Sequence, residues 1–366
     1  MRKVLIAVID GCAPEYLTRE TAPGIYRLAD KEGSFAKTVL AAVPTVTNVN
    51  HACILSGCFP KDTHVVGNYY YDRATGKQGF IEGKGFMQAP TVLEKYQSAG
   101  GKTALLTVKG KILEVFGSGV DLGISVQTPD YALLSKLGLP EPPQVQSPDS
   151  SRWIFQAAYA CLEKESPDLV YCTTNDFVMH HYDCTSEIAR RQIAAIDRWI
   201  CRIHELDPER EIYITADHGM NRKTTLIDLQ ALSDEAGFHM TCVPPLKDRY
   251  IENHLYQEGG ALYLYLHRPA EAEEILAFLD SLPAVEQVLP AGEAARLYHL
   301  PEKEIGDYVA FAAQSCAFGE VAEHVLHTEK VRTHGSLYER TVPLIAINSA
   351  APADRYTYSK DITCFL

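Results

Sequence analysis

The chain has 366 residues, 46% of them hydrophobic and 22% charged, and a formal net charge of -13. This length and composition suffice for a large core, and we expect one large domain and a smaller one. The acidic balance argues against nucleic acid or an anionic membrane as a partner, because no basic field would attract either of them. An anionic substrate would have to be attracted by local charges.

The sequence has no segment that approaches the length of a membrane span, and Met1-Arg2-Lys3 runs directly into an apolar stretch without the features of a signal peptide. We therefore expect a cytoplasmic protein. The 10 cysteines lack zinc-type spacing, and several of them stand within apolar runs. Free buried thiols are expected rather than a disulfide framework.

Three short apolar runs predict strands that are buried on both faces of a parallel sheet. They occupy residues 4–9, 168–172 and 212–215, with almost no alternation of polar and apolar residues. Helices are predicted around them at residues 91–98, 153–163 and 186–206. Alternating strands and helices are typical of an α/β fold with helices on both faces of a parallel sheet.

The segment from Pro44 to Gly57 predicts a loop that enters a helix, and a helix that ends at Gly57. Thr47 would then lie near the helix N-terminus, where unpaired backbone N–H groups and the helix dipole favour an anion. A threonine hydroxyl is a poor nucleophile by itself, but an adjacent metal ion can activate it at neutral pH. The alternative is that Thr47 only caps the helix.

Lys109 and Lys111 follow a strand-like run at residues 104–108. Alternate residues of an extended chain point to the same side, so the two ammonium groups would converge on one anion. A solvated lysine pair on a loop is the alternative explanation, and it is the more common one for such a pair in general.

Carboxylates and imidazoles cluster at or just after the predicted strands. The groups are Asp10, Asp176 with His180, Asp217 with His218, and His334 near the C-terminus. In an open α/β sheet, ligands gather at the carboxyl ends of the strands, so these residues would meet along one edge. Mixed carboxylate and imidazole ligands suit two divalent metal ions, above all Zn2+. Mn2+ or Fe2+ are further candidates, and Ca2+ is disfavoured because it prefers oxygen ligands alone.

Each of these groups alone has an ordinary structural explanation. An Asp after a strand commonly caps a helix or forms a turn, and Asp176 and His180 could pair on one helical turn. Asp217 with His218 is harder to explain in this way, because an ionisable pair directly after a buried strand needs partners. The joint pattern favours the metal interpretation.

The pattern changes between residues 238 and 314, where we expect a small α+β cap domain. The elements predicted there are strands at 260–266, 285–289 and 307–313 and a helix at 271–282. The catalytic core would then comprise residues 1–237 and 315–366. Because the insertion falls between His218 and His334, the cap is expected to lie above the site, where it could close over a substrate.

Five motifs in chain order resemble the alkaline phosphatase superfamily, specifically its phosphodiesterase-like branch: Asp10, Thr47, Asp176-x-x-x-His180, Asp217-His218-Gly219-Met220 and Thr333-His334-Gly335. The resemblance implies an alkaline-phosphatase-like α/β fold and two metal ions. One ion would be bound by Asp176, His180 and His334, and the other by Asp10, Thr47, Asp217 and His218. It also implies that Thr47 is the nucleophile and that Asn68 donates to a phosphoryl oxygen, which would stabilise the transition state.

Within this branch the chain most resembles the phosphonoacetate hydrolases. The features that point there are Lys109-Gly110-Lys111, Phe116-Gly117-Ser118-Gly119 and Asp217-His218-Gly219-Met220-Asn221-Arg222-Lys223. This resemblance implies that Lys109 and Lys111 bind a substrate carboxylate. Three features differ: Val49 stands where the branch usually has proline, Asn50-His51 is similar to the nucleotide pyrophosphatases, and His64-Val65-Val66 lacks the glycine that commonly follows this histidine.

The sequence therefore predicts a zinc hydrolase that cleaves the C–P bond of phosphonoacetate to acetate and phosphate. The alternative enzyme is a phosphodiesterase or nucleotide pyrophosphatase on the same dimetal site, in which Tyr69, Tyr70 or Tyr71 stacks on a base. A non-catalytic phosphonate or phosphate sensor is a third class, but a sensor does not need a nucleophile such as Thr47. The expected partner is a small anionic phosphonate or phosphate ester, and a homodimer is left open.

Overall fold

A seven-stranded sheet with the strand order β2-β16-β8-β1-β7-β5-β6 forms the larger part of the computed structural model, which describes residues 1–248 and 259–366. Its strands are β1 (Val4–Val8), β2 (Phe35–Leu40), β5 (Thr103–Thr107), β6 (Leu122–Ser125), β7 (Leu169–Thr173), β8 (Glu211–Thr215) and β16 (Thr341–Ile347). Six of them point in the same direction, and only β16 runs opposite to them, antiparallel to both β8 and β2. The predicted α/β fold with a mostly parallel sheet is confirmed.

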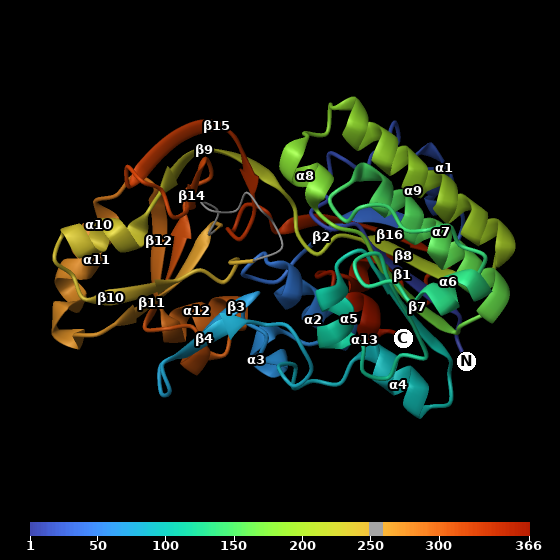
Figure 1. The fold of residues 1–366 in the computed structure, drawn as a ribbon, viewed down its shortest axis with the longest axis horizontal. Coiled ribbons are helices and arrows are strands. Elements are labelled where there is room, and N and C mark those ends of the chain that lie inside the picture. Colours follow the sequence, from blue (N-terminus) through green and yellow to red (C-terminus); the bar gives the residue numbers. More distant parts are fainter. Residues whose placement is uncertain (249–258) are drawn as a thin grey trace.

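Every residue of β1, β5 and β7 is buried, because helices cover both faces of the sheet. Helices α1, α7 and α9 lie on one face, and α2, α5 and α13 lie on the other (Figure 1). The helices of this part are α1 (Pro23–Ala29), α2 (Thr47–Ser56), α3 (Pro60–Thr63), α4 (Val92–Ser98), α5 (Gly110–Phe116), α6 (Tyr131–Lys136), α7 (Pro148–Glu165), α8 (Phe177–His181), α9 (Glu187–Leu206) and α13 (Asp361–Cys364). The apolar runs of the sequence are thus strands with two covered faces.

A second group of strands lies beside the large sheet (Figure 1). It contains a four-stranded antiparallel sheet, β10-β11-β13-β12, and a three-stranded sheet, β14-β9-β15. Its elements are β9 (Asn221–Ile227), α10 (Leu229–Glu235), β10 (Met240–Val243), β11 (Ala261–Leu266), α11 (Ala272–Asp280), β12 (Val285–Pro290), α12 (Ala291–Tyr298), β13 (Tyr308–Ala312), β14 (Cys316–Phe318) and β15 (Val325–Thr333), with the hairpin β3 (Tyr69–Asp72) and β4 (Lys77–Phe80) against them. The strands and the helix expected within 238–314 are present, whereas β9, β14 and β15 lie outside those limits.

None of the 10 cysteines forms a disulfide, and half of them are buried: Cys12, Cys53, Cys161, Cys172 and Cys316. The thiols are free as predicted, but only these five are buried. Among the helices within 1–248 and 259–366, none combines the length and the apolar character that crossing a bilayer requires.

Candidate active site

Four predicted site residues lie two or three residues beyond the ends of neighbouring strands of the large sheet. Asp10 follows β1, Lys109 follows β5, Asp176 follows β7 and Asp217 follows β8. Because parallel strands end at the same edge of a sheet, their side chains converge there. Lys109 is the most exposed of the four, and only 7% of its surface is accessible. The sheet therefore places three carboxylates and one ammonium group in a buried cluster.

His334 reaches this cluster from the three-stranded sheet. Strand β9 begins at Asn221, shortly after His218, and its antiparallel register with β15 pairs Asn221 with Thr333. The residue after Thr333 therefore lies beside His218, and the two imidazole rings stack with their centroids 3.6 Å apart. Strand pairing thus explains how a histidine near the C-terminus meets one that precedes the second part of the molecule.

Asp176, His180 and His334 form one group of side chains that could hold a metal ion. One ligand atom from each lies within 4.8 Å of the other two. Nε2 of His180 is 3.3 Å from Oδ2 of Asp176, and Nε2 of His334 is 4.0 Å from the same oxygen. The structure therefore brings together the residues that the sequence assigns to one metal ion.

The residues that the sequence assigns to the other metal ion also meet. Nε2 of His218 lies 3.6 Å from Oδ1 of Asp10, 3.3 Å from Oδ2 of Asp217 and 3.3 Å from Oγ1 of Thr47. Thr47 is the first residue of α2, whose N-cap is Val46. The predicted helix start is confirmed, and Thr47 is not the cap, so its hydroxyl is directed at the cluster instead.

The hydrogen bonds of three histidines identify which ring nitrogen faces the cluster. In each ring Nδ1 is 2.7 to 2.9 Å from a backbone carbonyl oxygen: His180 with Arg332, His334 with Thr45 and His218 with Gly219. A carbonyl oxygen only accepts, so the proton of each neutral ring lies on Nδ1 and a lone pair is left on Nε2. Burial lowers the pKa of His218, and it lowers that of His334 well below its usual value, which keeps both rings neutral.

The carboxylates of the cluster need a cation. Burial, together with Asp176 and Asp217, raises the pKa of Asp10 to about 8, and burial raises the pKa of Asp217 to about 6. Within the described ranges, Oδ1 of Asp10 and Oδ2 of Asp217 have no hydrogen-bond partner although both are buried. Buried carboxylate oxygens without donors are costly unless a cation offsets their charge. Together with the imidazole lone pairs, this donor set fits divalent metal ions.

Lys109 lies between the two predicted metal-binding groups. Its Nζ is 2.9 Å from Oδ2 of Asp10 and 2.8 Å from Oδ1 of Asp176. Burial acts to lower the pKa of this ammonium group, but the two carboxylates raise it above its ordinary value. In turn, and against the effect of burial, Lys109 holds the pKa of Asp176 well below its usual range.

Lys111 lies in the first turn of α5, because the helix begins at Gly110. The prediction of an extended chain through Lys111 is therefore wrong, and the two lysines do not project from alternate strand positions. The Lys111 ammonium pairs with Asp248, and Nδ2 of Asn68 lies 3.5 Å from the same oxygen, Oδ2. Asn68 is also tied to the start of α2, since its Oδ1 accepts from the N–H of Asn48 at 3.1 Å. Lys111 and Asn68 thus converge on one carboxylate.

Two residues of the cluster were not assigned to the site from the sequence. His51 is fully buried, and one ligand atom each of Asp10, His51 and Asp217 lie within 4.8 Å of one another. Its sequence signal is its spacing, because it follows Thr47 by one helical turn and so lies on the same face of α2. Asp248 has no comparable signal, since only the fold brings it to Lys111.

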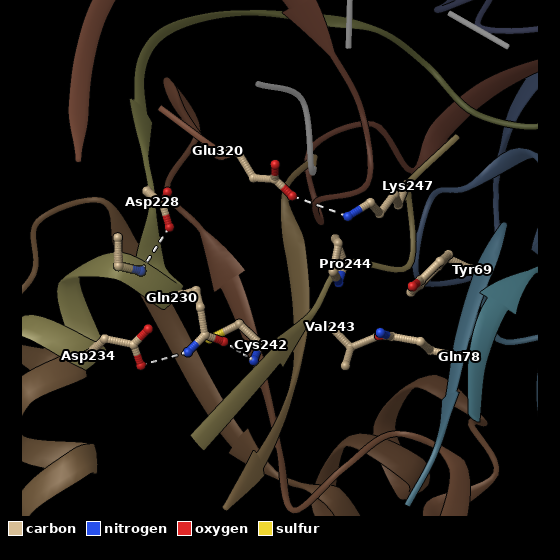
Figure 2. A pocket seen from close by; sticks show the side chains of 11 residues that line it. Tyr69, Gln78, Asp228, Gln230, Asp234, Cys242, Val243, Pro244, Lys247 and Glu320 are labelled. Atoms are coloured by element: carbon tan, nitrogen blue, oxygen red, sulfur yellow. Dashed lines mark hydrogen bonds and ion pairs between the residues drawn. The ribbon is translucent and has the colours of Figure 1, made fainter. Parts of the chain in front are cut away.

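A separate pocket of about 350 Å³ lies in the second part of the molecule (Figure 2). Its polar side chains bind one another: Lys247 pairs with Glu320 at 3.1 Å, and Gln230 donates to Asp234 at 3.0 Å. None of the predicted catalytic, substrate or metal residues lines it. Tyr69 lines this pocket, so this tyrosine borders a space outside the metal cluster.

The chain belongs to the type I phosphodiesterase / nucleotide pyrophosphatase family, because the model of that family matches residues 4–337. An uncharacterized pyrophosphatase/phosphodiesterase of Schizosaccharomyces pombe is 31% identical over 75 residues, which are 20% of this chain and 15% of that protein. The matching segment therefore spans much less than two thirds of this relative.

Solved structures of the same fold extend the comparison. Phosphonoacetate hydrolase from Sinorhizobium meliloti 1021, in complex with phosphonoformate or phosphonoacetate, matches with a TM-score of 0.88 and 28% identity over 99% of this chain and 94% of that chain. Murine ectonucleotide pyrophosphatase / phosphodiesterase 5 in complex with AMP matches with a TM-score of 0.69 and 16% identity over 100% of this chain and 93% of that chain. The resemblance stated from the sequence is confirmed, and the second likeness supports the fold alone.

Proposed function

We propose that this protein hydrolyses the carbon–phosphorus bond of phosphonoacetate to acetate and phosphate. The observation that carries the proposal is the convergence of Lys111 and Asn68 on a carboxylate oxygen of Asp248, next to the start of α2 with Thr47. A lysine that holds a carboxylate beside the nucleophile, with the amide of Asn68 next to it as a donor to phosphoryl oxygen, suits a substrate whose own carboxylate is one carbon from phosphorus. The likeness to a phosphonoacetate hydrolase along nearly the whole chain supports the same substrate.

In the proposed reaction, the Thr47 hydroxyl loses its proton to water, Oγ1 attacks phosphorus, and the C–P bond breaks as the O–P bond forms. The electron pair of the broken bond passes to carbon and spreads into the adjacent carboxylate, where Lys109 and Lys111 offset the charge. Nδ2 of Asn68 donates to a phosphoryl oxygen. A proton from water completes acetate, and a second water hydrolyses the phosphothreonine to phosphate and free Thr47.

Zinc is the proposed metal, because the donor set mixes carboxylates with imidazole Nε2 atoms. Asp176, His180 and His334 would hold one ion, and Asp10, Thr47, Asp217 and His218 would hold the other. When bound, the ions would offset the charge of the phosphoryl oxygens and lower the pKa of the threonine hydroxyl. A chelator should abolish activity, and zinc or manganese should restore it. Full activity in chelator, with no transition metal found by elemental analysis, would exclude this proposal.

We further propose that residues 238–314 act as a cap on this site. The carbonyl of Pro245 accepts from the N–H of Asn68 at 2.7 Å, and the Tyr263 hydroxyl donates to the carbonyl of Val66 at 2.7 Å. These contacts hold the segment that carries Asn68 against the cap. The cytoplasmic location and the oligomeric state stay predictions from the sequence.

The alternative activity, as a phosphodiesterase or nucleotide pyrophosphatase, is favoured by the family match and by Asn50-His51. Its base-binding residues would come from the tyrosines of β3. Each of these rings already contacts another aromatic ring: Tyr69 with Phe80, Tyr70 with Phe86 and Tyr71 with Tyr265. A base would therefore join existing aromatic pairs.

Replacement of Lys111 separates the two activities. Lys111→Ala should lower kcat/KM for phosphonoacetate. The loss should correspond to roughly 2–5 kcal/mol of transition-state stabilisation, the range for removing one partner of a buried charged pair. Hydrolysis of a nitrophenyl phosphodiester, which has no carboxylate, should change much less. Lys102→Ala, just before the opposite end of β5, is the matched control and should leave both rates unchanged. Equal losses on both substrates, or turnover of the diester alone by the unaltered protein, would favour the alternative activity.

A further inference from the structure

His51 has a hydrogen-bond pattern that differs from the other histidines of the cluster. Its Nδ1 is 2.6 Å from the hydroxyl oxygen of Tyr171, whereas the other three rings place Nδ1 against a backbone carbonyl. Its Nε2 is buried, lies 3.9 Å from Oδ2 of Asp217 and has no hydrogen-bond partner among residues 1–248 and 259–366. A hydroxyl can donate or accept, so the position of the His51 proton follows from what surrounds Tyr171.

The environment of Tyr171 places the His51 proton on Nε2. Tyr171 and His51 are both fully buried, and within the described ranges the contact with Nδ1 is the one hydrogen bond of the Tyr171 hydroxyl. If Nδ1 carried the proton, the hydroxyl hydrogen would be left without an acceptor, at a cost of about 1–3 kcal/mol. The Nε2 lone pair would also face the Asp217 carboxylate. With the proton on Nε2, the hydroxyl donates to Nδ1 and an N–H faces Asp217 instead.

The two carboxylate oxygens of Asp217 differ in their hydrogen bonds. Its Oδ1 accepts from the backbone N–H of Gly11 at 3.1 Å and from that of His218 at 3.0 Å. Its Oδ2 has no hydrogen-bond partner in the part of the chain that the structure describes, and it is the oxygen that faces Nε2 of both His218 and His51. The orientation of Oδ2 therefore depends on a donor such as His51.

We propose that His51 is a positioning residue of the metal site formed by Asp10, Thr47, Asp217 and His218. The Tyr171 hydroxyl donates to Nδ1 of His51, and Nε2–H of His51 donates to Oδ2 of Asp217, which holds that carboxylate in place as a ligand. A shift of the carboxylate by about 1 Å turns the contact into a hydrogen bond of ordinary length. The inference rests on the two-metal part of the proposed function and is independent of the substrate. His51 itself does not ligate the metal, because its Nε2 carries the proton.

The test measures metal binding rather than turnover. Zinc is titrated into the chelator-stripped protein in competition with a chromophoric chelator, which gives one dissociation constant for each of two equivalents. His51→Leu should weaken one equivalent by about 10–100-fold, as is usual when the hydrogen-bond partner of a ligand is lost, and should leave the other unchanged. His180→Ala should weaken the opposite equivalent. Unchanged binding of both equivalents by His51→Leu would overturn the proposal.

His51→Gln separates a positioning role from direct ligation and from a merely structural one. The Gln amide can accept from Tyr171 and donate to Asp217, but it is a weak zinc ligand. The zinc dissociation constants of this variant should therefore stay within about threefold of those of the unaltered protein, compared with the ~10–100-fold weakening expected for loss of the donor. Loss equal to that of His51→Leu would overturn the proposal. Thermal unfolding of the metal-free variants shows which of them fold.

Nitrogen NMR of the unaltered protein, labelled at histidine, provides a second measurement that needs no variant. The proposal expects a proton on Nε2 of His51 both without zinc and with zinc bound. Tyr171→Phe, which removes the hydroxyl donor, should release this preference and shift the signal toward the other tautomer. A His51 Nε2 without a proton in the zinc-bound protein would identify His51 as a direct ligand and overturn the proposal.

Discussion

Thr47 acquires its chemical role from its neighbours. Its side chain is 1% exposed, its hydroxyl lies 3.3 Å from Nε2 of His218, and it begins helix α2. The helix N-terminus favours an anion at this position, where the N–H of Asn48 in the first turn already donates to Oδ1 of Asn68. The sequence already singled out this residue by the loop before it and the glycine that ends the helix, where Gly57 has a φ of 77°.

Thr47→Ala should reduce kcat by at least ~10³-fold, since losing a catalytic nucleophile costs up to ~10⁶-fold in other hydrolases. Thr47→Ser keeps a hydroxyl and should retain part of the activity. Binding of substrate, followed by calorimetry, should survive in the alanine variant. Thr38→Ala, exposed on β2, is the control and should behave as the unaltered protein. If Thr47→Ala keeps a kcat within about tenfold of the unaltered protein, direct attack by water would be favoured.

A buried ion pair connects β9 to the segment that follows β15. Nζ of Lys223 in β9 lies 2.9 Å from Oε1 of Glu339, and both side chains are fully buried. Oε2 of Glu339 accepts from the backbone N–H and the hydroxyl of Ser336, which follows His334 closely in the chain. The backbone carbonyl of Glu339 also accepts from the N–H of Gly219 at 2.8 Å. This pair therefore connects the segments that carry His218 and His334.

Lys223→Met should lower the free energy of unfolding by about 3–5 kcal/mol, because it leaves the Glu339 carboxylate buried without its counter-ion. Urea unfolding of the metal-free protein measures the change. Arg222→Ala is the matched control: Arg222 is the neighbouring residue on the solvent side of β9, and its exposed pair with Glu329 should contribute no more than about 1 kcal/mol. Similar losses in the two variants would contradict a special role of the buried pair.

The contribution of the buried acidic cluster to the free energy of unfolding depends on pH. The pKa of Asp10 is raised to about 8 and that of Asp217 to about 6, in both cases chiefly by burial. The metal-free folded state therefore binds protons at these carboxyls more tightly than the unfolded chain does. The protonated carboxyls therefore stabilise the folded state at low pH. This stabilisation is lost as the pH rises through about 6 for Asp217 and about 8 for Asp10. Asp176 has a lowered pKa and affects stability only in more acidic solution.

Bound metal should offset this loss, because a cation replaces the protons. The difference in melting temperature between zinc-loaded and chelator-treated protein should therefore grow as the pH is raised from about 5 to about 8. Scanning calorimetry at a series of pH values checks this expectation. A difference that stays constant over the whole range, or that shrinks as the pH rises, would mean that the buried carboxylates and the metal site are not coupled.

The sequence by itself determined the strands and most of the chemistry of this protein. Apolar runs such as residues 4–9 form buried strands because their local composition has no polar face to expose. Acidic residues that follow such runs meet at one edge because parallel strands end together. The helix from Thr47 to Ser56 was likewise set by local signals at its two ends.

Only the tertiary structure decided which side chains meet across the cluster. Lys109 lies between Asp10 and Asp176, and Lys111 pairs with Asp248, through contacts between residues far apart in the chain. His51 faces Asp217 because α2 packs with Tyr171 of β7 beside it. Local sequence specifies the direction of a side chain within its own element, but the partner it meets depends on how separate elements pack, which no neighbouring residue encodes.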